Sequence, residues 1–171
     1  MKKITIIGNG GAGKSTLSLA LGKELRLPVF HLDQVIWKPK WVAISENDFD
    51  RRHKEILDQP EWIIEGMGYD STIEDRFISS DMIIYIDFPI AIHLYWAIKR
   101  SIKSIVVKPN GWQPGCQTVS KLPYILRIIW NVHKKTSPKI LKLLEAARNN
   151  RKIVHIKSPT QLNAFYKTFH A

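Results

Sequence analysis

The chain has 171 residues, a length that suits one compact domain with a buried core. Its 26 Lys and Arg against 15 Asp and Glu give a formal net charge of +11 at pH 7. No stretch approaches the roughly 18 uninterrupted apolar residues of a membrane span, and a glycine-rich segment begins too early, at Gly8, for a signal sequence. We therefore expect a cytoplasmic protein. The single cysteine, Cys116, excludes an internal disulfide and a multi-cysteine zinc site.

The positive charge is concentrated in the second half of the chain. Residues 99–157 hold fourteen Lys and Arg and one acid, Glu145, whereas residues 1–98 hold eleven basic and fourteen acidic residues. A strongly cationic half suits either a cage for phosphorylated ligands or a nucleic-acid surface. The alternative is a solvated basic helix face.

The first motif, GNGGAGKS, follows the buried-strand pattern of Ile4–Ile7 and leads into a segment with helical spacing of apolar residues. Gly, four residues and Gly-Lys-Ser between a strand and a helix is the P-loop pattern. Its glycines let backbone N–H groups face phosphate oxygens, and the following helix adds the positive end of its dipole. Lys14 can reach the outer phosphates, and the Ser15 hydroxyl can hold Mg²⁺. We expect ATP to be bound by Gly8, Gly10, Gly11, Ala12, Gly13, Lys14, Ser15 and Thr16.

A competing interpretation uses the same glycines. Gly8, Gly10 and Gly13 also fit the dinucleotide pattern Gly-x-Gly-x-x-Gly, and Asp33 lies at the distance of its ribose-binding acid. A dinucleotide site has no use for a lysine and a hydroxyl directly after the third glycine. Lys14 and Ser15 therefore favour the P-loop.

Acidic residues end three predicted strands, at the sheet edge where α/β proteins bind ligands. Asp33 follows Val29–Leu32, Glu65 follows Trp62–Ile64, and Asp87 follows Met82–Ile86. Asp33 is a candidate general base, a water-mediated magnesium contact, a group that orients an acceptor, or a helix cap. Glu65 and Asp87 are both candidate magnesium contacts, and strand order decides which is nearer the metal.

The remaining patterns predict alternating helices and strands with one loop, 109–115, that is rich in proline and glycine. Helices are expected from Lys14 to near Arg26, from Ser45 to about Gln59, over 71–80, from Pro89 through 98, over about 122–135, from a Ser137 cap with Pro138 as first residue to about 148, and from Ser158-Pro159 onward. A fifth strand is expected over 152–156. Arg76 is expected to face solvent rather than substrate.

With HLD at 31–33, WIIEG at 62–66, IDFP at 86–89 and Lys99-Arg100 after the P-loop, the sequence resembles the adenylate-kinase-like small-molecule kinases. More closely, it resembles the bacterial group called DNA topology modulation protein, FlaR-like. The resemblance covers nearly the whole chain. It implies an α/β P-loop NTPase fold, a three-layer sandwich with a five-stranded parallel sheet in the order 2-3-1-4-5. It also implies ATP as the phosphoryl donor and a single domain over 1–171 with a lid at about 104–135.

The same resemblance implies roles for residues beyond the P-loop. Arg100 and Arg127 occupy the places of arginines that grip phosphates, and Ser158 and Pro159 fall in the loop that borders adenine. One departure concerns the acceptor: adenylate-type enzymes carry Asp-Gly-Phe-Pro-Arg after the third strand, where this chain has EGMGY at 65–69. The arginine that would clamp an acceptor phosphate is absent there, which speaks against AMP. Arg76, slightly further along the chain, is the candidate replacement.

The sequence therefore predicts a phosphotransferase that binds Mg-ATP and transfers a phosphoryl group to a small-molecule acceptor of unknown identity. Lys14, Asp33, Arg100 and Arg127 are its expected catalytic residues, and Ser15, Glu65 and Asp87 its metal contacts. A nucleotide-dependent nucleic-acid-binding protein, acting through the basic half, is the alternative. A simple nucleotide hydrolase or switch comes third.

Overall fold

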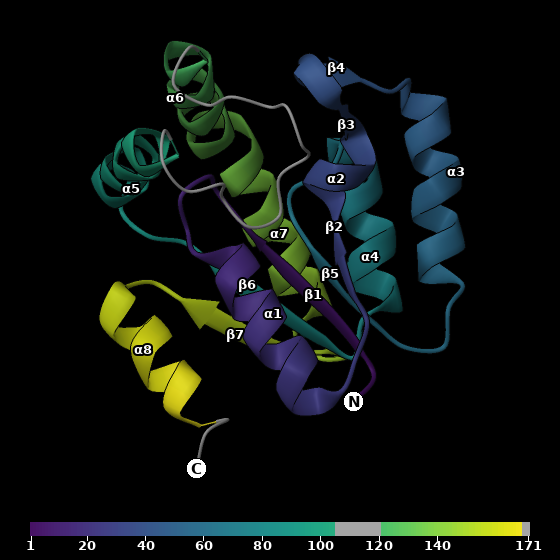
Figure 1. The fold of residues 1–171 in the computed structure, drawn as a ribbon. Coiled ribbons are helices and arrows are strands. Elements are labelled where there is room, and N and C mark those ends of the chain that lie inside the picture. The colour runs from purple at the N-terminus through teal and green to yellow at the C-terminus, as the bar shows by residue number, and fades with distance from the viewer. Residues whose placement is uncertain (105–120, 169–171) are drawn as a thin grey trace.

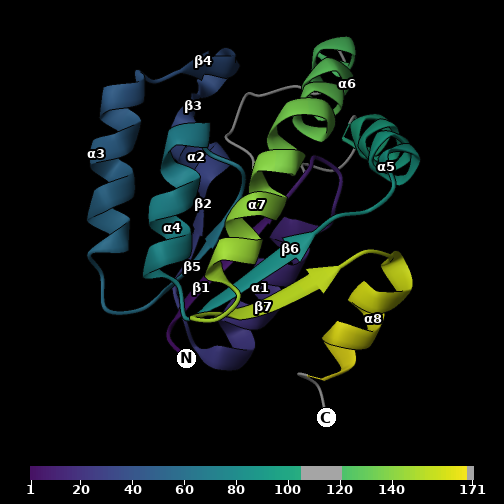
Figure 2. The same ribbon diagram turned by 180° about the vertical axis from the view of Figure 1, so that it is seen from behind.

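The computed structural model describes residues 1–104 and 121–168, apart from the side chain of Lys40. Five parallel strands form a central sheet (Figures 1 and 2). They are β1 (Lys3–Gly8), β2 (Val29–His31), β5 (Trp62–Glu65), β6 (Met82–Ile86) and β7 (Lys152–Ile156). Strands β1, β5 and β6 are almost entirely buried, as parallel strands are when helices cover both faces of the sheet.

The strand order is β2-β5-β1-β6-β7, with β1 in the middle. When only the strands of this sheet are numbered along the chain, the order is 2-3-1-4-5, as predicted. In register, Ile6 of β1 lies beside Glu65 of β5 on one side and Ile84 of β6 on the other. Because all five strands run the same way, their carboxyl ends share one edge with the glycine-rich loop.

Helices cover both faces of the sheet and make a three-layer sandwich (Figures 1 and 2). On one face lie α1 (Lys14–Leu25) and α8 (Pro159–Lys167), and on the other α4 (Ile73–Ser79) and α7 (Ser137–Ala147). Successive residues of β1 serve the two cores. Ile6 packs in the cluster of Leu17 and Leu162, and Ile7 packs in the cluster of Phe77 and Ile140. This alternation follows from the two-residue period of a strand.

One arm of the molecule follows β2. It contains α2 (Leu32–Ile36), β3 (Trp37–Lys38), the 3-10 turn η1 (Pro39–Trp41), β4 (Val42–Ala43) and α3 (Glu46–Leu57). The side chain of Ser45 accepts a hydrogen bond from the Asp48 N–H at 3.1 Å, which confirms the predicted cap of α3. The antiparallel hairpin of β3 and β4 was not predicted, because two-residue strands carry no periodicity to detect.

The other arm contains α5 (Ile90–Lys103), α6 (Leu122–Asn131) and the π-helical turn η3 (Val132–Thr136), which runs directly into α7. The predicted helix start at Ser137 is wrong: Thr136 and Ser137 are helical, and the Ser137 N–H bonds to the Val132 carbonyl five residues back. Pro138 has no N–H group, so it cannot donate the usual α-helical hydrogen bond to the Lys134 carbonyl four residues earlier. The wider turn that ends just before Pro138 accommodates this without ending the helix.

Half of the expected lid at about 104–135 and the whole of the 109–115 loop fall on residues 105–120, outside the described residues, so the lid stays a prediction. The part of it that the structure describes, from residue 121 on, is α6 and most of η3. A short 3-10 turn, η2 (Asp70–Thr72), precedes α4. Within 1–104 and 121–168, every helix is too short or too polar to cross a bilayer.

Candidate active site

The glycine-rich loop connects β1 to α1 and presents a row of backbone donors. Gly11 and Gly13 have φ of 73° and 77°, left-handed values that favour glycine. Hydrogen bonds within 1–104 and 121–168 account for the N–H groups of Gly10 and Leu17 but for none of those at positions 11–16. Unpaired N–H groups at a loop and helix N-terminus suit an anion, so the donor set fits a polyphosphate.

Lys14, the first residue of α1, lies across this loop. Its Nζ donates a hydrogen bond to the Asn9 carbonyl at 3.0 Å and stands 4.0 Å from Oε1 of Glu65. Burial lowers the pKa of the Lys14 ammonium, while the negative charges of Glu65 and Asp33 oppose that shift. The ammonium is therefore held in the loop by weak, replaceable contacts, which leaves it able to turn toward a bound phosphate.

Glu65 connects the P-loop to β2 through two hydrogen bonds. Its Oε2 accepts hydrogen bonds from Ser15 Oγ at 3.1 Å and from His31 Nδ1 at 2.8 Å. Burial pushes the pKa of Glu65 upward, but the His31 hydrogen bond and the Lys14 charge outweigh it, and the net shift is downward. Glu65 is therefore a carboxylate at neutral pH. His31 is a site residue that the sequence reasoning did not single out.

Asp33 and Arg100 face this group from two different arms. Asp33 lies in the first turn of α2, and Arg100 lies near the end of α5. Burial and the Glu65 charge raise the pKa of Asp33, while Lys14 and Arg100 lower it; the residue reaches solvent, which weakens each of these effects. Burial lowers the pKa of Arg100, and its favourable partners are Asp33 and Glu65. The sheet edge thus gathers two carboxylates and two cations around the loop.

Asp87 lies on the other side of β1, after β6. Its Oδ2 is 3.1 Å from Nε2 of His155 on β7, and it also interacts with the buried Tyr85 hydroxyl. The Ser15 hydroxyl donates to Glu65 and not to Asp87, although the strands that lead to both acids lie next to β1.

The other predicted site residues surround this centre less closely. Thr16 is exposed in the first turn of α1, and Arg127 is exposed on α6. The Ser158 side chain caps α8 by accepting from the Gln161 N–H, and Pro159 is the first residue of that helix. Ser158 and Pro159 thus lie at the junction between β7 and α8.

Two side chains that were not predicted as site residues, Asn9 in the loop and His93 on α5, connect the loop to α6 and α5. Asn9 donates through Nδ2 to the Ile129 carbonyl on α6 at 2.8 Å and accepts the Gly10 N–H at 2.7 Å. His93 on α5 bonds through Nδ1 to the Gly10 carbonyl at 3.0 Å. Because a carbonyl only accepts, Nδ1 of His93 carries the proton. Burial lowers the pKa of His93 to about 4, so the ring is neutral at pH 7.

Arg76 faces neither solvent nor substrate, so that prediction is wrong. The residue is fully buried, and its guanidinium donates to the carbonyls of Gly66 and Met67, directly after Glu65. Burial lowers the pKa of Arg76 to about 9, and the Glu65 charge opposes this shift. Arg76 holds the backbone of the EGMGY loop and cannot take the place of an acceptor-clamping arginine.

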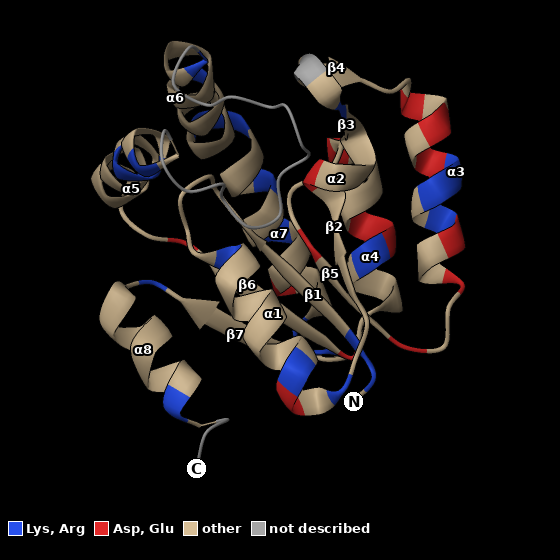
Figure 3. Cartoon of the chain, viewed as in Figure 1, with Lys and Arg blue, Asp and Glu red and all other residues tan. Residues whose placement is uncertain are grey.

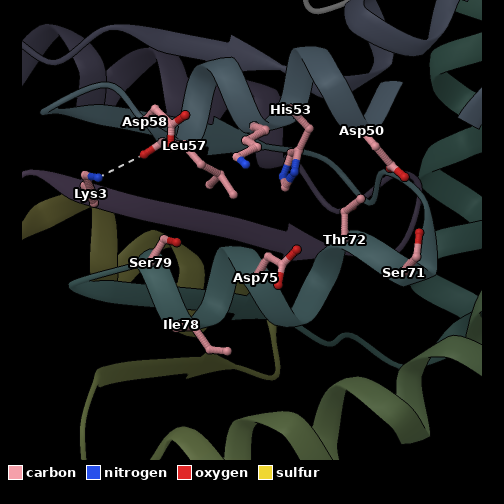
Figure 4. Close-up of a pocket in the computed structure, with 11 residues that line it drawn as sticks. Lys3, Asp50, His53, Leu57, Asp58, Ser71, Thr72, Asp75, Ile78 and Ser79 are labelled. Atoms are coloured by element: carbon pink, nitrogen blue, oxygen red, sulfur yellow. Dashed lines mark hydrogen bonds between the residues drawn. The ribbon is translucent and has the colours of Figure 1, made fainter. Parts of the chain in front are cut away.

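A hollow lies away from the sheet edge, between α3 and α4, with a volume of about 660 Å³ (Figure 4). His53 and Thr72 line it near one end and Lys3 near the other, where Lys3 Nζ donates to the Leu57 carbonyl. Acidic and basic side chains both line it, so its charge selects no ligand class.

A magnesium ion fits the P-loop group by the chemistry of its donors. Within 1–104 and 121–168, no three His, Cys, Asp or Glu side chains converge as a ready metal site. Mg²⁺ at nucleotide sites commonly needs only one or two protein oxygens, because phosphate and water supply the rest. Ser15 Oγ and the Glu65 carboxylate form such a pair.

Three comparisons place this geometry among known proteins. No family model matches the sequence. A shikimate kinase of Legionella pneumophila (strain Corby) is 38% identical over 66 residues, which cover 34% of this chain and 38% of that protein. The match thus spans well under half the length of this curated relative.

Two solved structures match over nearly the whole chain. Shikimate kinase from Acinetobacter baumannii, in complex with shikimate, has a TM-score of 0.54 at 14% identity and covers 99% of this chain and 91% of its own. The enzyme from Bacteroides thetaiotaomicron has a TM-score of 0.53 at 14% identity, covering 99% and 96%. At this identity the likeness establishes the fold: the chain has the α/β fold of P-loop small-molecule kinases.

Proposed function

We propose that this protein is an ATP-dependent phosphotransferase with a small-molecule acceptor. One observation carries the proposal: Lys14, Ser15 and Glu65 meet at the end of a loop whose backbone donors have no protein acceptor within the described residues. The shikimate kinase neighbours support the same reaction class.

In this proposal the loop and α1 bind the triphosphate. The N–H groups of residues 11–15 and the Lys14 ammonium hold its phosphates, and Ser158 and Pro159 border its base. Ser15 and Glu65 would hold Mg²⁺, with Asp87 as the more distant candidate. When bound, Mg²⁺ offsets negative charge on the transferred phosphoryl group.

Asp33 is the proposed general base for a hydroxyl acceptor. It lies at the sheet edge, where the charges of Glu65, Lys14 and Arg100 act on it, so its carboxylate can accept the proton of a hydroxyl bound beside the phosphates. Arg100 and Arg127 supply positive charge beside the phosphates. The buried position of Arg76 supports an alcohol over a nucleoside monophosphate, because no arginine of the EGMGY loop region is left to bind a second phosphate.

The test is ADP release from Mg-ATP with a panel of nucleosides, nucleoside monophosphates and small polar alcohols. Lys14→Ala should lower turnover at least about a hundredfold with the circular dichroism spectrum unchanged, because it removes a cation aimed at the reacting phosphates. Lys23→Ala, an exposed lysine in the last turn of the same helix, is the matched control and should keep full activity. Equal turnover in the Lys14 and Lys23 variants would refute the proposal.

The second candidate is nucleic-acid binding by the basic half, of the kind that the topology modulation resemblance implies. The observation that favours it is the distribution of charge in Figure 3, where Lys and Arg recur along α5, α6 and α7. Lys134, Lys135 and Lys142 are exposed in η3 and α7. Binding that weakens steeply with added salt would support it.

A further inference from the structure

Trp41 stands out because its backbone is left-handed. Its φ is 62°, and in the described part of the chain the only other non-glycine residue with positive φ is Arg26, which caps the end of α1. At a helix end this conformation is common, but for a bulky aromatic residue between two strands it is a true outlier. Such a conformation persists only where surrounding contacts hold it, and it is found mostly at functional sites.

The contacts that hold Trp41 reach across two arms of the molecule. Its ring meets Trp37 edge to face, with ring centres 5.3 Å apart and an interplanar angle of 69°. It also packs against the buried cluster of Ala97, Ile125 and Ile129 on α5 and α6. Trp41 therefore ties the hairpin that follows Asp33 to the arm that carries Arg100.

The cluster that receives Trp41 lies directly on the P-loop. A Cβ built on Gly10 would stand 2.9 Å from Cγ1 of Ile129, so this side chain already touches the loop. The strap formed by residues 37–43 is a hairpin whose two ends, Trp37 and Ala43, pair with each other, and whose turn places Trp41 against the cluster beside the loop. It follows Asp33 along the chain, and Asp33, Glu65, Lys14 and Arg100 act on one another electrostatically.

We propose that Trp37 and Trp41 form the aromatic wall of the acceptor site and that Trp41 limits the size of the acceptor. This inference rests on the proposed phosphotransferase function. The indole rings provide an apolar face, so the acceptor has a ring or other apolar face beside the hydroxyl that Asp33 deprotonates. Because the strap is held at its base by the pairing of β3 with β4 and at its turn by Trp41, it forms a fixed wall that leaves room for a small molecule and excludes water from the phosphates.

The experiment compares Trp41→Ala, Trp41→Phe and the matched control Trp130→Ala. Trp130 is a half-exposed tryptophan on α6 that interacts with Lys134 outside the strap. ADP release is measured without acceptor and with ring-bearing alcohols of increasing size, from cyclohexanediols to nucleosides. Trp41→Ala should raise KM for the best small acceptor about tenfold or more, accelerate acceptor-free hydrolysis several-fold and admit larger alcohols. Trp41→Phe should restore the wild-type order of acceptors, and Trp130→Ala should leave it unchanged.

A folded Trp41→Ala variant with wild-type KM, hydrolysis and acceptor order would overturn the inference. Hydrogen exchange separates this failure from failure of the phosphotransferase proposal, because it requires no turnover. Trp41→Ala should speed exchange of the amides in 42–44 and 125–129, whereas Trp130→Ala should not affect 42–44. Unchanged exchange would show that the strap is not held by Trp41. If wild type and Lys14→Ala are equally inactive while the expected exchange pattern is observed, the phosphotransferase proposal is refuted, but the contacts of Trp41 that hold the strap are supported.

Discussion

At the scale of single residues, two buried histidines make the fold sensitive to mild acid. His53 and His93 are each 2% exposed. Burial is the main cause that lowers the pKa of each to about 4, and the positive charge of Arg76 lowers the pKa of His53 further. In the unfolded chain both titrate near 6.5, so between pH 6.5 and 4 the unfolded state binds more protons. Stability is therefore highest above pH 6.5 and falls as the pH drops toward 4. Each histidine contributes up to about 1.4 kcal/mol per pH unit.

Urea unfolding at pH 7, 6 and 5 measures this loss, and His53→Phe isolates one contribution. A phenyl ring can keep the stacking on Phe49, whose ring centre lies 5.6 Å from that of His53, without titrating. The variant should lose about half of the excess pH dependence of the free energy of unfolding. It should also remove one buried, unpartnered nitrogen, since His53 Nε2 has no hydrogen-bond partner within the described residues. A pH dependence identical to wild type would contradict the assignment.

The residues that sequence predicted best are those whose role depends on local pattern. Lys14 and Ser15 follow from the P-loop motif, and Glu65 from its place at a strand end. What could not be predicted is pairing over long separations: His31 with Glu65, or Asn9 with a carbonyl 120 residues away. Arg76 was placed in solvent because arginines mostly lie there, and nothing local reveals that two backbone carbonyls receive its guanidinium.

At the scale of elements, the side chain of Asn9 ties the P-loop to α6 by a hydrogen bond. Asn9 is buried and bridges the Gly10 N–H and the Ile129 carbonyl. Asn9→Ala should weaken binding of Mg-ATP about tenfold and lower the free energy of unfolding by about 1–2 kcal/mol, because it removes two buried hydrogen bonds from a preorganised loop. Isothermal titration with a non-hydrolysable ATP analogue and urea unfolding measure the two effects.

Asn131→Ala is the control for this prediction. Asn131 is exposed at the end of the same helix and should tolerate alanine without change in affinity. If Asn9→Ala binds the analogue as wild type does, the loop keeps its shape without α6, and the described coupling has no role in binding.

Strands and helices were predictable where burial is periodic and capping residues are local. The five strands of the sheet and the Ser45 and Ser158 caps are cases in point. The hairpin of β3 and β4 and the continuous helix through η3 were missed. Both depend on tertiary contacts: Trp41 on α5 and α6, and Thr136 and Lys139 on Asp70. A Ser-Pro pair predicts a helix start, yet here it lies inside a helix.

At the scale of the whole molecule, the uneven charge has two candidate uses that the structure separates spatially. Arg100 is partly buried, and its charge acts on Asp33 and Glu65 at the sheet edge. Lys134 and Lys135 are exposed in η3, beyond the end of α6. Figure 3 shows basic residues on both α5 and the α6–α7 helix. The first kind of cation suits phosphate neutralisation, and the second suits a solvated face or a polyanion.

Two variants distinguish these uses. Arg100→Ala should lower kcat about a hundredfold or more, because a cation beside the reacting phosphates is lost where solvent screens poorly. The double variant Lys134→Ala with Lys135→Ala should leave kcat within about twofold, because neither lysine has a described contact with the P-loop group. If the basic helix also binds duplex DNA, the double variant should weaken that binding and lower the slope of log affinity against log salt by about two. A large fall in kcat in the double variant would instead show that the lysines of η3 also act on the bound phosphates. Full activity of Arg100→Ala would contradict the proposed role of Arg100 in neutralising phosphate charge.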